Sequence, residues 1–219
     1  MPTQGEYHPA FEEYCECIYE LREDDIDVIQ ARIADRLEIS RPAVSEMIKR
    51  MEAEGLVTVD DGIRLTADGR ALGERVVRRH RLAERFLTDV LKLSWAEAHH
   101  EAGKWEHVMS ESVEQAMDEL LGNPTTCPHG NPIPGSDYEQ GDFSALASIE
   151  VGGSFTVQRI TEELEFEPGL LEFLEESEIQ PGNDGTVVAS SPDGTLTVTI
   201  GDRHVGVGAF ASERILVTA

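Results

Sequence analysis

Acidic and histidine side chains recur in this sequence at spacings that place ligands on one face of a helix. Glu13 and Glu16 lie three residues apart, and His80 and Glu84 lie four apart. A third set follows the pattern i, i+4, i+7, i+8: His99, Gly103, Glu106 and His107. Such positions share one face of a helix. Imidazole and carboxylate together suit Mn²⁺, Fe²⁺, Co²⁺, Ni²⁺ or Zn²⁺, so the pattern indicates a divalent metal site shared by separate helices.

The same residues have a second interpretation, which spacing alone leaves open. A single histidine is more often an ordinary core or surface residue, and acidic pairs are expected by chance in a chain with 43 Asp and Glu residues. These positions hold no thiol, which disfavours a structural zinc site with cysteine ligands.

A group of basic residues near the N-terminus indicates contact with nucleic acid. Its cations are Arg32, Arg36, Arg41, Lys49, Arg50 and Arg64. They lie on or beside a predicted recognition helix, which begins Ser40-Arg41-Pro42-Ala43-Val44-Ser45-Glu46. Solvated helix faces are the alternative, but the rest of the chain is poor in cations, which favours DNA. Glu46 only accepts hydrogen bonds and repels phosphate, so it gives no base preference.

Hydrophobic periodicity predicts the elements that position these residues. Apolar residues at every third or fourth position predict a helix over about 10–23, and two shorter helical patterns follow. Ser40 is the expected N-cap of the second of these, and Gly55 ends it. Asp61-Gly62 then joins two short strands in a hairpin. Helix, turn, helix and hairpin together predict a winged helix-turn-helix, whose second helix enters the major groove.

The pattern changes twice beyond the hairpin. Helices are predicted over about 66–92, 95–108 and 111–121. Residues 122–142 are rich in Gly and Pro, which marks a loop or linker and places a domain boundary near 143. Short β-type runs follow, with one helical stretch over 168–176, and predict a small β-barrel. The predicted fold class is mainly α with a small β domain.

Composition limits the kind of protein this is. The chain has 219 residues, of which 40% are hydrophobic, enough for packed domains and too many for gross disorder. No apolar run approaches the roughly 20 residues that span a bilayer. Its three cysteines are unlike a disulfide framework, which favours a reducing compartment without bridges. A soluble cytoplasmic protein is expected.

The net charge of −25 is distributed unevenly. Residues 26–85 carry 12 basic and 11 acidic residues, whereas residues 145–219 carry 3 and 13. Only three of the cations are lysines. An acidic, lysine-poor surface suits a cytosol of molar salt, in which charges are screened within about 3 Å. A halophilic host is therefore predicted, and an ordinary acidic protein is the alternative.

DNA binding by such a protein is predicted to depend less steeply on salt than it does in a more basic DNA-binding protein. Phosphate contacts release counterions, so the slope of log affinity against log salt is about −0.9 per neutralised phosphate. A protein adapted to molar salt should rely on fewer of these contacts. Fluorescence anisotropy with a labelled duplex from low to molar KCl measures the slope, and a steep loss of binding would contradict the prediction.

The sequence resembles the diphtheria-toxin-repressor and manganese-transport-regulator family of metal-dependent transcription repressors. The stretches that carry the resemblance are Ile18-Tyr19-Glu20-Leu21, Ala31-Arg32-Ile33-Ala34, Val44-Ser45, Arg50-Met51-Glu52, Gly55-Leu56-Val57, Arg78-Arg79-His80-Arg81-Leu82-Ala83-Glu84-Arg85, Trp105-Glu106-His107-Val108-Met109-Ser110 and Gly130-Asn131-Pro132-Ile133-Pro134-Gly135. They cover residues 10–136 in unbroken order. The tail from about 147 looks like the SH3-like module, of the ferrous-transport accessory (FeoA) type, of longer members.

The resemblance implies three domains. Residues 1–75 correspond to the winged helix-turn-helix, 76–143 to a helical dimerisation and metal-binding domain, and 144–219 to the SH3-like barrel.

The resemblance also implies two sets of metal ligands. The regulatory set is Glu13, Glu16, His80, Glu106 and His107. Gly103 stands where relatives place a cysteine or a bridging glutamate, and it offers only its backbone carbonyl. The ancillary set is His80, Glu84, His99 and, from the tail, Glu167, with Leu170 where the iron branch has a glutamine. His80 belongs to both sets.

Cys127 and His129 lie off this pattern in the proline-rich loop. A thiol and an imidazole two residues apart could bind a metal, but their place in this loop favours a structural role. Cys15 and Cys17 point about 200° apart on a helix, so they are predicted to be packing residues.

The function implied is a homodimeric repressor that binds operator DNA when Mn²⁺ or Fe²⁺ is bound, and that controls the uptake of that metal. A metal-independent winged-helix regulator is one alternative. A metal-dependent hydrolase is another, but the sequence has no G-x-S-x-G motif and no phosphate loop, so we expect no enzyme.

Overall fold

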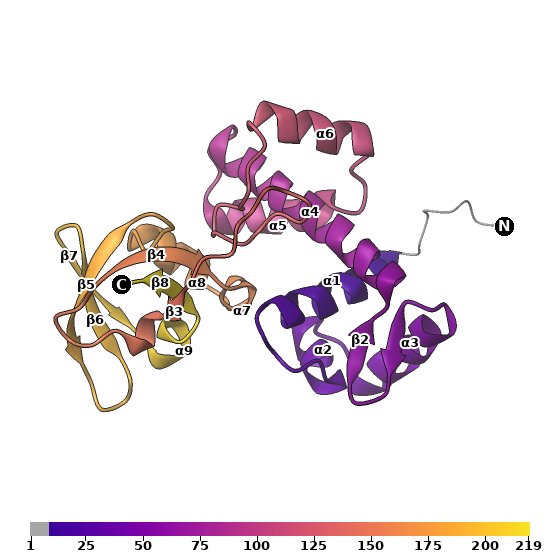
Figure 1. Cartoon of the computed structure of the whole chain (residues 1–219), viewed down its shortest axis with the longest axis horizontal. Coiled ribbons are helices and arrows are strands. Elements are labelled where there is room, and N and C mark those ends of the chain that lie inside the picture. The colour runs from indigo at the N-terminus through magenta and orange to yellow at the C-terminus, as the bar shows by residue number, and fades with distance from the viewer. Residues whose placement is uncertain (1–8) are drawn as a thin grey trace.

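The computed structural model describes residues 9–219, which form three parts in succession (Figure 1). The elements of the N-terminal part are α1 (Pro9–Glu23), α2 (Gln30–Arg36), α3 (Arg41–Ala53), β1 (Val57–Val59) and β2 (Ile63–Leu65). β1 and β2 pair as an antiparallel hairpin. The order is that of a winged helix-turn-helix, which confirms the prediction.

The local sequence explains how α3 is held. The Ser40 hydroxyl accepts a hydrogen bond from the Ala43 N–H at 3.4 Å, and Pro42 lies in the first turn, where its missing N–H costs little. Gly55 has φ 75° just beyond the helix, a conformation that favours glycine. Val44 and Ile48 are buried in the domain core, so the opposite side of α3 faces solvent.

α4 (Ala67–Asp89) connects the N-terminal part to the helical part. It spans 23 residues and packs against both α1 and α5 (Trp95–Trp105), and α6 (Glu111–Leu120) lies beyond them. Gly73 allows the close approach to α1, because a Cβ there would lie 2.7 Å from the Cys15 carbonyl oxygen. α4 continues unbroken through residue 75, where the first domain is predicted to end, so the two parts share one helix.

The C-terminal part is a six-stranded antiparallel sheet with short helices around it. Its elements are β3 (Ser144–Ala145), η1 (Leu146–Ser148), β4 (Ser154–Ile160), α7 (Glu162–Glu165), α8 (Leu170–Glu176), β5 (Asp184–Ser190), β6 (Leu196–Ile200), β7 (Arg203–Val207), α9 (Ala209–Ser212) and β8 (Ile215–Thr218). The strand order is β3-β8-β4-β5-β6-β7. The fold class, mainly α with a small β domain, is confirmed, whereas β3, η1, α7 and α9 were not predicted.

The loop between α6 and β3 brings its own side chains to the interior. The Ile160 N–H donates to the His129 carbonyl at 2.8 Å, which joins the loop to β4. Gly130 has φ 89°, and a Cβ there would lie 2.2 Å from the Gln158 carbonyl oxygen, so only glycine fits. Cys127 and His129 are fully buried as a result. Within residues 9–219, no helix is both long and apolar enough to cross a membrane.

Candidate metal centres and DNA interface

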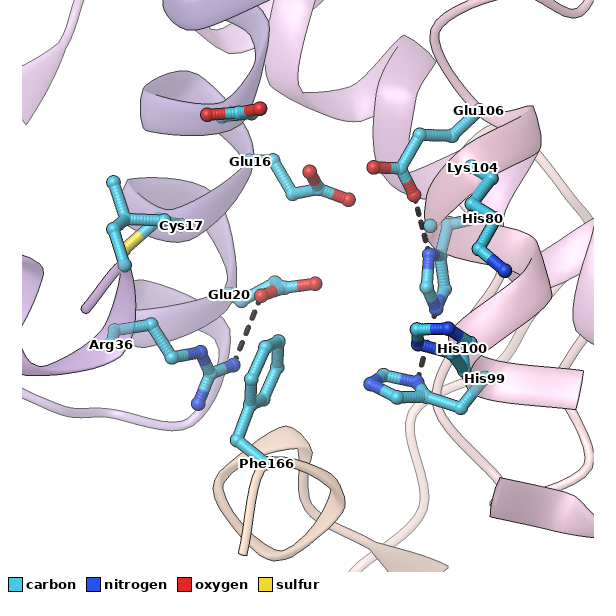
Figure 2. Close-up of a pocket in the computed structure, with 13 residues that line it drawn as sticks. Glu16, Cys17, Glu20, Arg36, His80, His99, His100, Lys104, Glu106 and Phe166 are labelled. Carbon is cyan, nitrogen blue, oxygen red and sulfur yellow. Dashed lines mark hydrogen bonds and ion pairs between the residues drawn. The ribbon is translucent and has the colours of Figure 1, made fainter. Parts of the chain in front are cut away.

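One cluster of potential metal ligands joins α1 to the end of α5. It consists of Glu16, Glu106 and His107, whose ligand atoms lie within 4.8 Å of one another, and we call it the first cluster. Figure 2 shows the Glu16 carboxylate directed from α1 across the pocket toward Glu106. Burial raises the pKa of Glu16 well above its ordinary value, and the Glu106 and Glu20 carboxylates raise it further. A cation between these acids would remove that repulsion.

A cavity of about 380 Å³ opens beside the first cluster. Glu13 lines it and is exposed, so it lies outside the three-residue group that holds Glu16. Gly103 also lines it, and a Cβ at Gly103 would meet nothing within 4 Å. The position that the resemblance marks as a missing ligand is therefore open space, large enough for water.

A second cluster lies deeper, where α4, the loop and the tail meet. Glu84, Cys127 and His129 place their ligand atoms within 4.8 Å of one another, and we call them, with the neighbouring His99 and Glu165, the second cluster. Cys127 and His129 are 0% exposed, and the Nε2 of His129 has no hydrogen-bond partner within the described part of the chain. The other ring nitrogen, Nδ1, lies 3.5 Å from a Glu84 oxygen. A buried imidazole, a thiol and a carboxylate in one group fit a metal ligand set.

His80 lies between the two clusters. Its Nδ1 is 2.5 Å from a Glu106 oxygen, and its Nε2 is 3.2 Å from a Glu84 oxygen and 3.2 Å from the Nδ1 of His99. His80, Glu84 and His99 also satisfy the distance criterion for a shared ion. The structure thus brings the predicted ancillary trio together and leaves His80 able to serve either centre.

The histidines of these clusters are held in the protonated form by their acidic neighbours. Hydrogen bonds to Glu106 and Glu12 raise the pKa of His107 to about 10. Burial lowers the pKa of His99, but hydrogen bonds to Glu165 and Glu84 raise it to about 10. A metal ion must therefore displace protons from these imidazoles when it binds.

One predicted residue lies away from the clusters. Glu167 was predicted to come from the tail, but it is exposed and lines a separate pocket, and the tail residue beside the histidines is Glu165. Glu165 lies 2.9 Å from His129 Nδ1 and 3.3 Å from His99 Nδ1. Cys127 and His129, for which the sequence favours a structural role, lie with their ligand atoms within 4.8 Å of Glu84. Their spacing of two residues is the sequence signal for a metal site here.

The predicted DNA-contacting residues divide into two groups. Those that are exposed, on α2, on or just before α3 and on β2, are Arg32, Ser40, Arg41, Pro42, Ala43, Glu46, Lys49, Arg50 and Arg64, and Ser45 is half-buried. Their exposure leaves them accessible to a duplex.

Arg36 differs from these residues. Its side chain is 8% exposed and pairs with Glu20 of α1 at 3.0 Å. Its guanidinium lies 3.6 Å from the centre of the Phe166 ring. The prediction that Arg36 contacts DNA is corrected, because its charge is already neutralised inside the molecule.

Known protein families match all three parts of the chain. Family models for the N-terminal DNA-binding domain and for the metal-binding and dimerisation domain of iron-dependent repressors match residues 7–61 and 66–135, and a FeoA domain matches 145–219. The iron-dependent repressor IdeR of Mycobacterium tuberculosis is 40% identical over 202 residues, which are 86% of this chain and 87% of IdeR. This chain belongs to the iron-dependent repressor family.

Other relatives of this family member include a diphtheria toxin repressor and two manganese regulators. The diphtheria toxin repressor of Corynebacterium efficiens is 39% identical over 86% of each chain. A manganese-dependent transcriptional repressor, solved in complex with manganese, matches with a TM-score of 0.85 and 30% identity over 95% of this chain and 99% of that chain. The manganese regulator SloR matches with a TM-score of 0.75 and 29% identity over 95% and 97%. The resemblance noted in the sequence is confirmed, and so is the SH3-like tail.

Proposed function

We propose that this family member is a metal-dependent transcriptional repressor that binds operator DNA as a homodimer and controls metal homeostasis, with Mn²⁺ or Fe²⁺ as the activating ion. The observation that carries the proposal is the first cluster, in which Glu16 of the DNA-binding domain faces Glu106 and His107, directly after α5. A ligand set shared between two parts of the chain lets metal occupancy control their relative position.

The residues of the first cluster perform the switch. Glu16 is repelled by Glu106 when no ion is bound, which weakens the attachment of α1 to the turn after α5. A bound divalent cation supplies the positive charge that turns this repulsion into attraction. Glu16 then holds α1, and with it α3, in one orientation relative to the dimerisation helices. Two recognition helices of a dimer read successive major grooves when they are about 34 Å apart.

The dimer is expected to form through the helical part. Its largest exposed apolar side chains are Val90, Leu91, Val108, Val113 and Leu120. They lie on or beside the ends of α4, α5 and α6, next to a small core that includes Met109 and Met117. Apolar patches of this kind are typical of protein interfaces. The dimer places this face inside and leaves both copies of α3 free for DNA.

We assign the metal centres a regulatory role rather than a hydrolytic one. We also propose that the protein acts in the cytoplasm, where operator DNA lies. The domain limits proposed are 1–75, 76–143 and 144–219. The first eight residues of the N-terminal domain lie outside the described residues.

Operator binding is expected to require the first cluster. We would titrate Mn²⁺, and Fe²⁺ without oxygen, into protein with a labelled duplex selected from the host genome, in molar KCl. Wild type should bind at least about tenfold more tightly with metal than under chelator, and Glu106→Gln should lose most of this gain. Glu101→Gln, which changes a carboxylate of α5 that pairs with Lys104, is the matched control and should respond normally. Equal binding by wild type with metal and under chelator would overturn the proposal.

A further inference from the structure

Phe166 contacts both the DNA-binding domain and the second cluster. It follows α7 directly, and 46% of its surface is exposed. The Arg36 guanidinium of α2 lies 3.6 Å from the ring centre, and the His99 ring meets the same ring edge-on at 5.3 Å between centres. In Figure 2 the ring rises from the tail into the gap between Arg36 and His99. One side chain of the tail thus bridges two parts of the molecule.

The backbone of α7 links Phe166 to a ligand of the second cluster. Glu165 is the preceding residue, and its carboxylate lies 2.9 Å from His129 Nδ1. The Asn131 amide donates a hydrogen bond to Glu165 at 2.6 Å. Glu162, at the start of the same short helix, pairs with the fully buried Arg81 at 2.6 Å. Glu165 and Phe166 are adjacent on a single turn, so a backbone shift that carried Glu165 toward a bound ion would carry Phe166 with it.

Arg36, on the other side of this contact, is joined by a short segment to the recognition helix, α3. Arg36 is the last residue of α2, and only residues 37–40 separate α2 from α3. Its guanidinium donates to Glu20 at 3.0 Å, while its buried Nε has no hydrogen-bond partner among the described residues. Its position therefore depends on Glu20 and on the face of Phe166.

We infer that Phe166 is a positioning residue, which transmits metal occupancy of the second cluster through Arg36 to the recognition helix. The inference rests on the proposed function and extends it, because it assigns the tail a path to DNA that is separate from the first cluster. The ring does not touch the metal. It fixes the guanidinium at the end of α2 once Glu165 is held by the ion.

The test separates metal binding from operator binding in the full-length protein. Co²⁺ titration, followed by the absorbance of the cobalt–thiolate bond to Cys127, reports the second cluster. Anisotropy of an operator duplex, with saturating Mn²⁺ and under chelator, reports the DNA-binding domain. Phe166→Ala should keep the cobalt midpoint of wild type and its weak binding under chelator, and should bind the operator about tenfold more weakly with Mn²⁺. Phe166→Tyr retains the aromatic face and should restore binding.

Phe210→Ala is the matched control. Phe210 also lies in the tail, is 40% exposed and has the guanidinium of Arg214 4.0 Å from its ring centre, so its removal costs a contact of the same kind that does not involve Arg36. It should behave as wild type. A full metal-induced gain in Phe166→Ala would overturn the inference, and so would an equal loss of cobalt and operator affinity, since Phe166 would then only shape the ligand set. Failure of the proposed function is distinct, because wild type itself would then show no metal response.

Discussion

Cobalt binding to the wild-type protein is expected to give an intense thiolate-to-metal absorption band that disappears in Cys127→Ser. Burial, and then the Glu84 and Glu165 carboxylates, raise the pKa of the Cys127 thiol well above its ordinary value, so the thiol is neutral without metal. An ion bound to the sulfur releases this proton. Loss of one ligand should weaken metal binding at the second cluster by about a hundredfold or more, since even outer partners of a metal site contribute 10–100-fold.

Two further variants complete this experiment. His129→Ala should weaken metal binding as strongly as Cys127→Ser, because both side chains face Glu84 from the same loop. Cys17→Ala is the control, since Cys17 is buried elsewhere, on α1, and its loss should leave the band intact. A band that persists in Cys127→Ser and vanishes in Cys17→Ala would show that the second cluster is not a metal centre.

Metal affinity is expected to rise steeply with pH. His107 and His99 have pKa values of about 10, so both are protonated at neutral pH without metal. Metal binds the neutral imidazole. Below pH 10 a proton must therefore leave each imidazole before the metal can bind it, and this cost lowers the apparent metal affinity. The affinity should therefore increase about tenfold per pH unit for each imidazole that loses a proton, and about a hundredfold if two do.

Calorimetry in buffers of different ionisation enthalpy would count these protons directly. Glu12→Gln removes one of the two carboxylates that raise the pKa of His107, and it should reduce both the proton count and the slope of affinity against pH. Glu119→Gln, on the exposed side of α6, is the matched control. Binding at pH 7 without proton release would contradict the charged state of the histidines described above.

The residues of the first cluster could be placed from the sequence because Glu16 lies on a regular helix and Glu106 and His107 directly follow one. A helix has a fixed phase, so these positions could be assigned to faces before their partners were known. Glu12 was missed because it neighbours Glu13, the residue predicted as a ligand, and only the tertiary structure shows which of the two meets His107. Here Glu12 lies 2.9 Å from it.

The second cluster could not be assembled in this way. Cys127 and His129 belong to an irregular loop, whose side-chain directions follow from tertiary hydrogen bonds rather than from a repeat. α7 is a single turn among several glutamates, so its phase is undefined by sequence and Glu165 was passed over for Glu167. The inward position of Arg36 depends on Phe166, which lies 130 positions further along the chain.

The same distinction between long regular elements and short irregular ones applies to the prediction of secondary structure. The predicted helix over 10–23 is observed as Pro9–Glu23, and the β-run at Leu196–Ile200 is observed with the same limits. Short elements such as β3, α7 and α9 carry too few residues to show a period.

The contrast between the open space at Gly103 and the sealed surroundings of His129 has a kinetic consequence. An ion at the first cluster can exchange with solvent through the cavity while the fold stays intact, so its occupancy follows the free concentration outside within the time of diffusion and dehydration. An ion at the second cluster leaves only when the loop and the tail separate. The molecule thus combines a rapidly exchanging metal site with a slowly exchanging one. A brief fall in the metal concentration would empty the first cluster while the second stays filled.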